Sequence, residues 1–432
     1  MTDAFVTDTI FALSSGAPPA AIGVIRISGP AAGTALQALA GRLPAPRRAA
    51  MARLRDAGGD LLDQALVLWL PGPGTATGED MAELHCHGGR AVIAAVEAML
   101  AREPGLRRAA SGEFTRRAFV NGRVDLAEAE GLADLLSAET ELQRRSALAM
   151  AGGSLSRQVA DWRDRLLMAS AQVEAVLDFA DEDEVSVLPP DFTATLSGLA
   201  GEIGVWTRRP RAETLREGFR IVLAGPPNAG KSSLFNALTE SEAAIATPVP
   251  GTTRDVLTKP VAIAGVPLLF VDTAGLRDAA DDAVEAIGIA RARSAAQSAD
   301  LVLWLGDEGE GPAGAWEIDP QIDRSDRPRK RARRHAVSAT TGQGIAALQA
   351  DLADRARGAM PTPGEAALNA RQAALLGQAA AALASAAGDA RRDPLIVAED
   401  LRLARVTFDA LLGRTTTEDL LDALFGRFCI GK

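Results

Sequence analysis

The chain is 432 residues long, 47% hydrophobic, and carries a formal net charge of −10. This length predicts about two or three domains, each with enough apolar side chains for a core. No window holds the roughly 18 uninterrupted apolar residues of a membrane span, and the first residues do not read as a secretory signal. Only Cys86 and Cys429 are present, which excludes a disulfide scaffold and indicates a cytoplasmic protein with free thiols.

The acidic balance excludes a broad basic face of the kind that coats nucleic acid. One local run, from Arg324 to Arg334, is strongly basic. It is either a local patch for RNA or, as charge runs more often are, a solvated surface loop. The solvated loop is the simpler interpretation.

Residues 1–118 predict a compact α/β unit. Apolar runs at 21–27 and 64–70 are typical of strands, and the alanine-rich stretch 90–102 is typical of a helix. Helical spacing of apolar residues then follows from about 123 to 177.

Helical patterning resumes after Leu188-Pro-Pro190 and ends near residue 209. Residues 218–356 alternate strand and helix signals, which predicts a doubly wound parallel sheet. Beyond Pro361-Thr-Pro-Gly364 the chain is again helical almost to its end. The economical architecture is a multidomain α/β plus α chain, in which a nucleotide-binding domain is inserted into a split helical domain. We place the segments at 1–118, 119–217, 218–358 and 359–432.

Residues 225–232 read GPPNAGKS and lie between a predicted strand, Phe219–Ala224, and a predicted helix from Lys231. Backbone N–H groups of such a loop surround phosphates, and the helix N-terminus adds positive potential. In this pattern Lys231 reaches the terminal phosphates and Ser232 offers a hydroxyl to Mg²⁺. The loop therefore predicts a nucleotide site.

Two further elements follow the phosphate loop in the expected order. Gly251-Thr-Thr-Arg-Asp255 offers Thr253 as a second hydroxyl ligand for Mg²⁺. An apolar strand from Pro267 ends at Asp272, which can hold the water shell of the metal, and the N–H of Gly275 can meet a γ-phosphate.

Leu301–Leu305 reads as another strand, and Val337–Thr341 fits a loop that packs against a purine base. The order and spacing of these elements predict a GTPase core. The predicted nucleotide-contacting residues of these elements are Asn228, Ala229, Gly230, Lys231, Ser232, Ser233, Thr253, Asp272, Thr273, Ala274, Gly275, Asp326, Ser338 and Ala339.

The loop that would read guanine is altered. Such a loop normally contains Asn-Lys-x-Asp, whose Asp accepts hydrogen bonds from the base. The segment most similar to this motif is Asp323-Arg-Ser-Asp326, and Pro320-Gln-Ile-Asp323 aligns with it less well. We take Asp326 as the base-reading carboxylate and expect weakened selectivity for guanine.

Catalysis must also differ from that of many GTPases, which orient the attacking water with a Gln. The corresponding position here is Leu276, which cannot form a hydrogen bond. Glu285 can act through a bridging water, although its spacing fits an exposed helix residue equally well. Asn228 can hold a monovalent cation beside the phosphates, and K⁺ there would supply positive charge.

Five stretches of this chain follow one known pattern almost from end to end. The chain resembles the MnmE (TrmE) family of tRNA-modification GTPases, whose members end in Cys-x-Gly-Lys. The matching stretches are Ile22–Gly29, Thr77–Gly89, Gly112–Phe119, Asn121–Glu130 and Phe428–Lys432.

The resemblance implies a homodimer whose N-terminal domain binds a tetrahydrofolate one-carbon donor, either the 5-formyl or the methylene derivative. It also implies a split helical domain with an inserted G domain. An FAD-containing partner, MnmG (GidA), takes part in modifying C5 of the wobble uridine in certain tRNAs. By position, the family's folate-contacting residues match Arg26, Glu83, Arg123 and Lys432. A carboxylate and cations suit the pterin edge and the glutamate tail.

The resemblance also implies how hydrolysis can proceed with Leu276 in place of the catalytic Gln. The family's G domains pair across a K⁺ ion held at the position of Asn228, and the residue at the position of Glu285 carries catalysis. Thr247, Val249 and Thr252 fall where the family's loop contributes further K⁺ ligands. The resemblance thereby implies that Thr247 and Thr252 also contact the nucleotide.

Some alternatives stay open. A ribosome-assembly GTPase would usually carry a basic RNA-binding domain, and a folate-dependent transferase with a vestigial nucleotide domain fits the altered guanine loop. The run His85-Cys86-His87 invites a metal site, but its residues more simply line a pocket or serve the core. Cys429 is a reactive thiol or a small buried residue beside the folate pocket.

Overall fold

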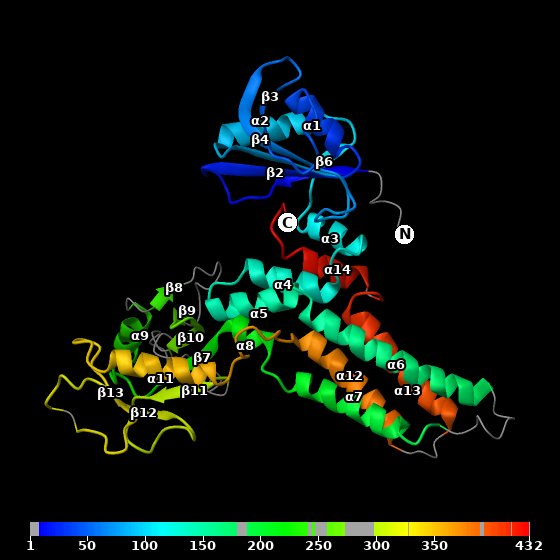
Figure 1. Ribbon diagram of the computed structural model, residues 1–432. Coiled ribbons are helices and arrows are strands. Elements are labelled where there is room, and N and C mark those ends of the chain that lie inside the picture. The colour runs from blue at the N-terminus through cyan, green and yellow to red at the C-terminus, as the bar shows by residue number, and fades with distance from the viewer. Residues whose placement is uncertain are drawn as a thin grey trace, which may run out of the picture. The chain divides into compact units, whose positions relative to one another are not determined.

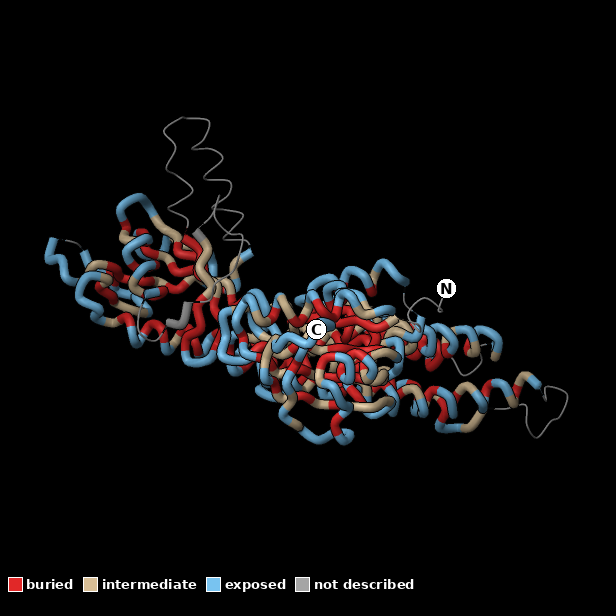
Figure 2. Tube along the Cα trace, turned by 90° about the horizontal axis from the view of Figure 1, so that it is seen from above, coloured by how far each residue is buried: buried red, intermediate tan, exposed pale blue. Residues whose placement is uncertain are grey.

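The structure, a computed structural model, describes residues 8–178, 188–240, 244–246, 257–272, 298–326, 328–388, 393–415 and 417–431. The chain forms two compact units. Figure 1 shows its helices and strands, and Figure 2 shows which residues are buried. Unit 1 comprises residues 1–133 and 409–432, and unit 2 comprises residues 134–408.

Unit 1 is built on a six-stranded sheet with the strand order β3-β4-β5-β2-β1-β6. Its core comes from the alternation of the strands, because Ile25 and Ile27 of β2 are buried while Arg26 between them faces the other way. The strands are β1 (Thr9–Leu13), β2 (Ile22–Ser28), β3 (Ala50–Arg55), β4 (Leu61–Leu70), β5 (Met81–His87) and β6 (Leu106–Arg108). Helices α1 (Ala32–Ala40) and α2 (Arg90–Leu100) contribute buried residues to the same core.

The C-terminal end of the chain returns to this unit. Helix α14 (Glu418–Phe425) shares an apolar cluster with α4 (Leu126–Leu136). Beyond it, Ile430 forms an isolated β-bridge with Ser111. Gly431 has a φ of 96°, and a Cβ at that position would lie 2.1 Å from the carbonyl oxygen of Leu13. Only glycine allows the terminal peptide to lie this close to the end of β1.

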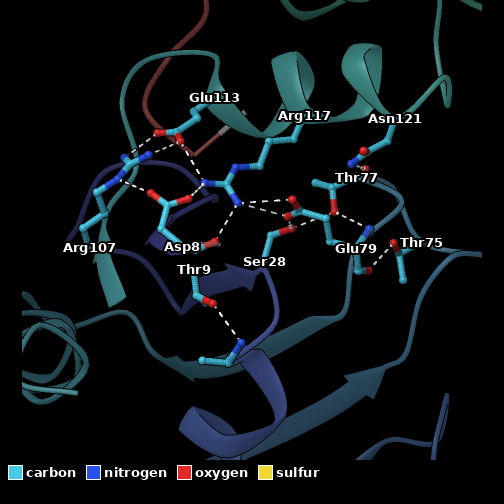
Figure 3. Close-up of polar contacts among 11 residues, drawn as sticks. Asp8, Thr9, Ser28, Thr75, Thr77, Glu79, Arg107, Glu113, Arg117 and Asn121 are labelled. Carbon is cyan, nitrogen blue, oxygen red and sulfur yellow. Dashed lines mark hydrogen bonds and ion pairs between the residues drawn. The ribbon is translucent and has the colours of Figure 1, made fainter. Parts of the chain in front are cut away.

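A buried ionic cluster fastens helix α3 (Glu113–Val120) to the sheet (Figure 3). The Arg117 side chain is 2% exposed and donates hydrogen bonds to Asp8 at 2.7 Å, Glu113 at 3.1 Å and Glu79 at 3.2 Å. Arg107 on β6 donates to Glu113 as well. The cluster therefore joins the start of β1, the segment before β5 and the first turn of α3.

Unit 2 contains a seven-stranded sheet with the order β13-β12-β11-β7-β10-β9-β8. Strands β7, β10, β11, β12 and β13 pair in parallel. Strand β9 pairs antiparallel with both β10 and β8. The strands are β7 (Phe219–Ala224), β8 (Ala244–Ala246), β9 (Leu257–Ile263), β10 (Val266–Asp272), β11 (Leu301–Trp304), β12 (Trp316–Asp319) and β13 (His335–Ala336). Helices α9 (Lys231–Thr239) and α11 (Ile345–Arg357) share its core.

The remaining helices of unit 2 flank this sheet in the sequence. They are α5 (Glu141–Ala151), α6 (Ser154–Asp178), α7 (Phe192–Thr207), α8 (Ala212–Glu217), α12 (Ala370–Ala387) and α13 (Pro394–Leu411). Helices α7 and α12 pack side by side, although the whole sheet lies between them in the sequence (Figure 1). The sheet region is thus an insertion between two helical segments that pack together.

The structure and the expected fold class agree: one α/β unit, a second sheet with a phosphate loop, and helices on both sides of it in the sequence. Strands predicted at 21–27, 64–70 and 219–224 are present, with bounds that differ by up to three residues. Among the described residues, no helix is both long enough and apolar enough to cross a bilayer.

Candidate functional site

The phosphate loop joins the carboxyl end of β7 to the first residue of α9. The Lys231 side chain is buried, and its Nζ donates to the carbonyl oxygens of Gly225 at 3.1 Å and Pro226 at 2.9 Å. The ammonium group is therefore held inside the loop, close to where phosphate oxygens would replace the carbonyls as partners.

Two residues of this loop adopt left-handed backbone conformations. Gly230, which precedes α9, has a φ of 95°, and Asn228 has a φ of 58°. A Cβ on Gly230 would lie 3.0 Å from the Nε2 atom of Gln321. The loop thus passes directly beneath the segment that follows β12. Asn228, Ser232 and Ser233 are exposed, whereas Ala229 is buried, so two hydroxyls of the first helical turn remain accessible to a ligand.

Asp272 is the last residue of β10 and is fully buried. Strand β10 pairs in parallel with β7, and Asp272 lies opposite Leu223, one residue before the end of β7. Because carboxyl ends of parallel strands meet at one edge of a sheet, Asp272 lies at the edge from which the phosphate loop departs. This is where a carboxylate can order the water shell of a phosphate-bound metal.

A cavity of about 170 Å³ lies beside the phosphate loop. Its lining joins the loop and α9 to the segments after β12 and β13, through Gly230, Ser233, Leu234, Pro320, Gln321, Asp323, Arg324, Val337, Ala339 and Thr340. A hydrogen bond with Ser338 lowers the pKa of the Asp323 carboxyl, so this group is a carboxylate at neutral pH. The cavity offers a negative acceptor and a small residue, Ala339, to a ligand bound at the loop.

Asp326, which the sequence favoured as the base-reading carboxylate, is not among the residues that line this cavity. Its carboxylate pairs instead with Arg324 at 2.8 Å, and both side chains are more than half exposed. Asp323 lines the cavity because it follows β12 by four residues. In the sequence this aspartate stood only in the poorer alignment, Pro320-Gln-Ile-Asp323, because the four-residue strand before it is too short to show a periodic pattern.

Ser338 is fully buried, and its hydroxyl accepts a hydrogen bond from the N–H of Thr341 at 3.1 Å. This contact shapes the turn that presents Ala339 to the cavity. Several predicted site residues lie outside the described part of the chain, namely Thr247, Val249, Thr252, Thr253, Thr273, Ala274, Gly275, Glu285 and Lys432.

A second polar site lies on the sheet of unit 1. Arg26 on β2 and Glu83 on β5 are direct cross-strand partners, and two guanidinium nitrogens donate to Glu83 Oε1 at 3.0 and 3.1 Å. The other oxygen of Glu83 lies 3.3 Å from His85 Nε2. The Glu83 side chain is 18% exposed, so it is fixed in orientation and still reachable. A carboxylate held this way can accept hydrogen bonds from the N–H donors of a ligand.

Two other residues predicted for this site lie on separate segments of unit 1. Arg123 is exposed just beyond α3, and its stem lies beside Gly78. Cys429 is exposed and precedes Ile430, which bridges to Ser111. The structure therefore brings Arg26 and Glu83 together, and it places Cys429 on the terminal segment next to the end of β1.

The His85-Cys86-His87 run is occupied by local contacts. His85 faces Glu83, and His87 Nδ1 lies 2.7 Å from Asp63. Burial, together with the nearby charge of Asp63, raises the pKa of the Cys86 thiol to about 12, so thiolate is scarce at neutral pH. The described residues contain no group of three or more side chains suited to hold a metal ion.

Comparison with known families adds a second kind of observation. Residues 9–123 match the family described as GTP-binding protein TrmE N-terminus. Residues 126–429 match the family described as MnmE helical domain. These two matches account for most of the chain.

Several relatives are similar over nearly the full length. Proteins named tRNA modification GTPase MnmE from Novosphingobium aromaticivorans and Erythrobacter litoralis are each 64% identical, over 99% and 98% of this chain and 100% of their own. The protein of that name from Zymomonas mobilis is 50% identical over 98% of this chain and 100% of its own. Among solved structures, the G domain of the T. maritima FeoB iron transporter is 23% identical, with a TM-score of 0.23, over 32% of this chain and 98% of that one.

Proposed function

The chain belongs to the MnmE family of tRNA modification GTPases, and from this premise we propose the reaction that it serves. It hydrolyses GTP while modifying C5 of the wobble uridine in certain tRNAs. It works in the cytoplasm as a homodimer with the FAD-containing partner MnmG (GidA), and the added carbon comes from a tetrahydrofolate derivative. The observation that carries the proposal is the buried Lys231 in a phosphate loop between β7 and α9.

Different residues around the phosphate loop bind the phosphates and the base of the nucleotide. Lys231 and the N–H groups at the start of α9 bind the phosphates, and Asp323 accepts hydrogen bonds from the base. Mg²⁺, when bound, neutralises charge on the β- and γ-phosphate oxygens. Ser232 and Thr253 would hold that ion, with Asp272 ordering its water shell.

Fewer polar residues than usual are available to select guanine. Pro320 and Gln321 stand where Asn and Lys are normal, so only Asp323 of the usual polar set is present at the cavity. We therefore propose that GTP is preferred over ATP by a smaller margin than in GTPases with the full motif. Competition by GTP and ATP analogues measures the margin, and discrimination of several hundredfold would contradict the proposal.

Hydrolysis proceeds without a catalytic Gln. Asn228 with Thr247, Val249 and Thr252 would hold K⁺, whose charge compensates the negative charge that develops on the transferred phosphoryl group. Glu285 would orient the attacking water. We expect K⁺ but not Na⁺ to stimulate hydrolysis, and Glu285→Ala to abolish it while GTP binding survives. Equal rates in the two salts would refute the cation's part in this scheme.

The folate donor would bind in unit 1. The fixed carboxylate of Glu83 pairs with the pterin edge, and the cations of Arg26, Arg123 and Lys432 surround the rest of the ligand. We retain four segments in this proposal: 1–118 for folate binding and dimerisation, 218–358 for the G domain, and 119–217 with 359–432 for the helical domain.

The function as a whole is tested by mass spectrometry of wobble uridines from cells that lack this protein. We expect the C5 modification to be absent and to return with the wild-type chain. The Lys231→Ala variant should not restore it, because phosphate binding is lost. Normal modification in the deleted strain would refute the proposed function.

A further inference from the structure

The segment that joins β12 to β13 carries an unusual concentration of positive charge. Between Arg324 and Arg334, which we call the basic loop, the sequence has seven Lys or Arg residues and one acidic residue, Asp326. The chain as a whole has a net charge of −10. The nucleotide site uses Arg324 only as part of its rim, so the remaining basic residues have no role in the proposed function.

Two of the basic residues hold the loop in place. The Lys330 side chain is 8% exposed, and its Nζ contacts Glu317 at 2.6 Å and the carbonyl oxygen of Trp304 at 3.0 Å. The Arg334 guanidinium lies 3.9 Å from the centre of the Trp316 ring and pairs with Asp351 at 2.8 Å. Buried ammonium and stacked guanidinium groups of this kind fix the backbone rather than meet a ligand.

The other basic side chains between Pro328 and Arg334 lie at the surface. Arg329 is exposed and donates to the carbonyl oxygens of Gln321, Ile322 and Arg324. Arg333 is also exposed and donates to the carbonyl oxygen of Lys330 at 2.7 Å. The Arg329 charge also interacts with the Asp323 carboxylate, whereas the carbonyl partner of Arg333 orients its guanidinium group without neutralising it.

The loop retains net positive charge after its local contacts are counted. Among the described residues, five carboxylates interact with it, from Asp323, Asp326, Glu308, Glu317 and Asp351. Glu308 accepts hydrogen bonds from the N–H groups of Arg331 and Ala332. Five negative charges against the seven Lys and Arg residues in the sequence of the loop still leave a positive surplus. Exposed guanidinium groups suit phosphate oxygens, two of which each group can bind.

We propose that the basic loop binds the phosphate backbone of tRNA, with Arg331 and Arg333 as direct contacts. The proposal rests on the proposed function insofar as tRNA is the substrate. It adds that this chain itself contacts the RNA through its nucleotide-binding region, in place of a broad basic face.

The position of the loop has a consequence for regulation. It begins at the segment whose Gln321, Asp323 and Arg324 line the nucleotide cavity, and Arg329 donates to carbonyl groups of that segment. A contact of RNA with the loop would therefore lie only a few hydrogen bonds away from residues that line the nucleotide cavity, and any coupling through them would act in both directions. By linkage, tRNA changes nucleotide affinity by the same factor that nucleotide changes tRNA affinity.

The test compares tRNA affinity of the full-length chain across a salt series, with fluorescently end-labelled tRNA as the probe and anisotropy as the readout. The double variant R331Q/R333Q removes two charges from exposed positions. If both contact phosphates, the slope of log K against log salt falls by roughly 1.4 to 1.8, and affinity at low salt drops about tenfold or more. Basal GTP hydrolysis stays unchanged, because neither residue belongs to the nucleotide site.

Two controls separate charge from structure. R331K/R333K keeps both charges and should keep the salt slope. Arg402→Gln removes an exposed Arg that pairs with Glu399 on α13 and should leave tRNA binding as in the wild type. A slope and affinity of R331Q/R333Q equal to the wild-type values would overturn the proposal.

Other outcomes also decide the matter. If the double variant binds tRNA normally but loses the FAD-containing partner, the loop is a protein contact and the proposal is wrong. If wild type binds no tRNA while wobble modification still requires the chain, the proposal fails and the proposed function stands. Normal wobble modification in cells that lack the chain would refute the proposed function independently of the loop.

Discussion

Asp323 and Asp326 show how much a single position matters at the nucleotide cavity. Both are acidic and three residues apart, yet only Asp323 lines the cavity, where the hydrogen bond with Ser338 lowers its pKa. Asp326 instead forms an exposed ion pair with Arg324. An exposed pair of this kind contributes little to stability or to ligand binding.

We expect Asp323→Ala to weaken GTP binding by about 10- to 100-fold, because hydrogen bonds to a charged group contribute roughly 1.5–3 kcal/mol. The loss should be smaller for ATP, whose base lacks the N1 and N2 donors of guanine. Titration with a fluorescent GTP analogue measures the change. Asp326→Ala is the matched control and should bind GTP as the wild type does; the reverse order would restore Asp326 as the base-reading residue.

Arg116 and Arg117 are neighbours on α3 with opposite environments. The Arg117 side chain is 2% exposed within a cluster of carboxylates, whereas Arg116 pairs with Glu418 and Asp422, which are 73% and 64% exposed. Removing one member of a buried charge cluster leaves the others without compensation.

Arg117→Met should therefore destabilise unit 1 by about 3 kcal/mol or more, whereas Arg116→Met should cost less than about 1 kcal/mol. Urea unfolding, followed by hydrogen exchange in peptides of α3 and β1, measures both. Similar costs for the two variants would show that the buried cluster has no special role.

At the scale of an element, the start of α3 depends on Glu113. Its carboxylate accepts hydrogen bonds from Arg107 and from the N–H of Ala110 at 2.8 Å. Burial alone would raise the pKa of Glu113, but the bonds from Arg107, Ala110 and Arg117 outweigh it and lower the pKa below its usual value of 4.5. A depressed pKa in the folded state stabilises the fold above the unfolded-state pKa, and this contribution disappears as pH falls through the folded-state value.

Glu113→Gln should thus be less stable than the wild type at pH 7, and the difference should shrink as pH falls below about 4.5. Thermal unfolding of both chains between pH 7 and pH 3 supplies the comparison. Glu418→Gln, on the exposed end of a surface pair, serves as control. A stability gap that stays constant with pH would mean that ionised Glu113 is not what holds the helix.

At the scale of the whole molecule, two compact units carry two separate candidate sites. The phosphate loop and its cavity lie in unit 2, and the Arg26–Glu83 pair lies in unit 1. A ligand stabilises the fold that binds it, and the gain is about 2.7 kcal/mol at a ligand concentration 100 times Kd. Each ligand should consequently act first on its own unit.

We expect GTP with Mg²⁺ to slow hydrogen exchange in peptides of β7, α9 and the segment after β12. A tetrahydrofolate derivative should instead protect peptides of β2 and β5. Lys231→Ala removes the first effect and leaves the second, and Glu83→Ala does the reverse. Equal protection of both units by either ligand would contradict independent sites.

Much of this protein is determined by local sequence. A long apolar strand next to a glycine-bearing loop fixes the β7–α9 phosphate site, because backbone N–H groups and a helix N-terminus need no distant partner. The helices of unit 2 follow from apolar spacing in the same way. Short strands such as β1, β6 and β12 carry too few residues for a periodic signal, so they form only where a neighbouring strand accepts their hydrogen bonds.

Tertiary structure decided which residues make direct contact within a site. Only the sheet order brings Arg26 opposite Glu83, and only the parallel pairing of β12 with β11 places Asp323 in a cavity with Gly230. The sequence by itself determined that phosphates are bound and that the fold is α/β with an insertion. It did not determine which aspartate lines the cavity beside the phosphate loop or how the basic loop is held, because those contacts join segments that are apart in the chain.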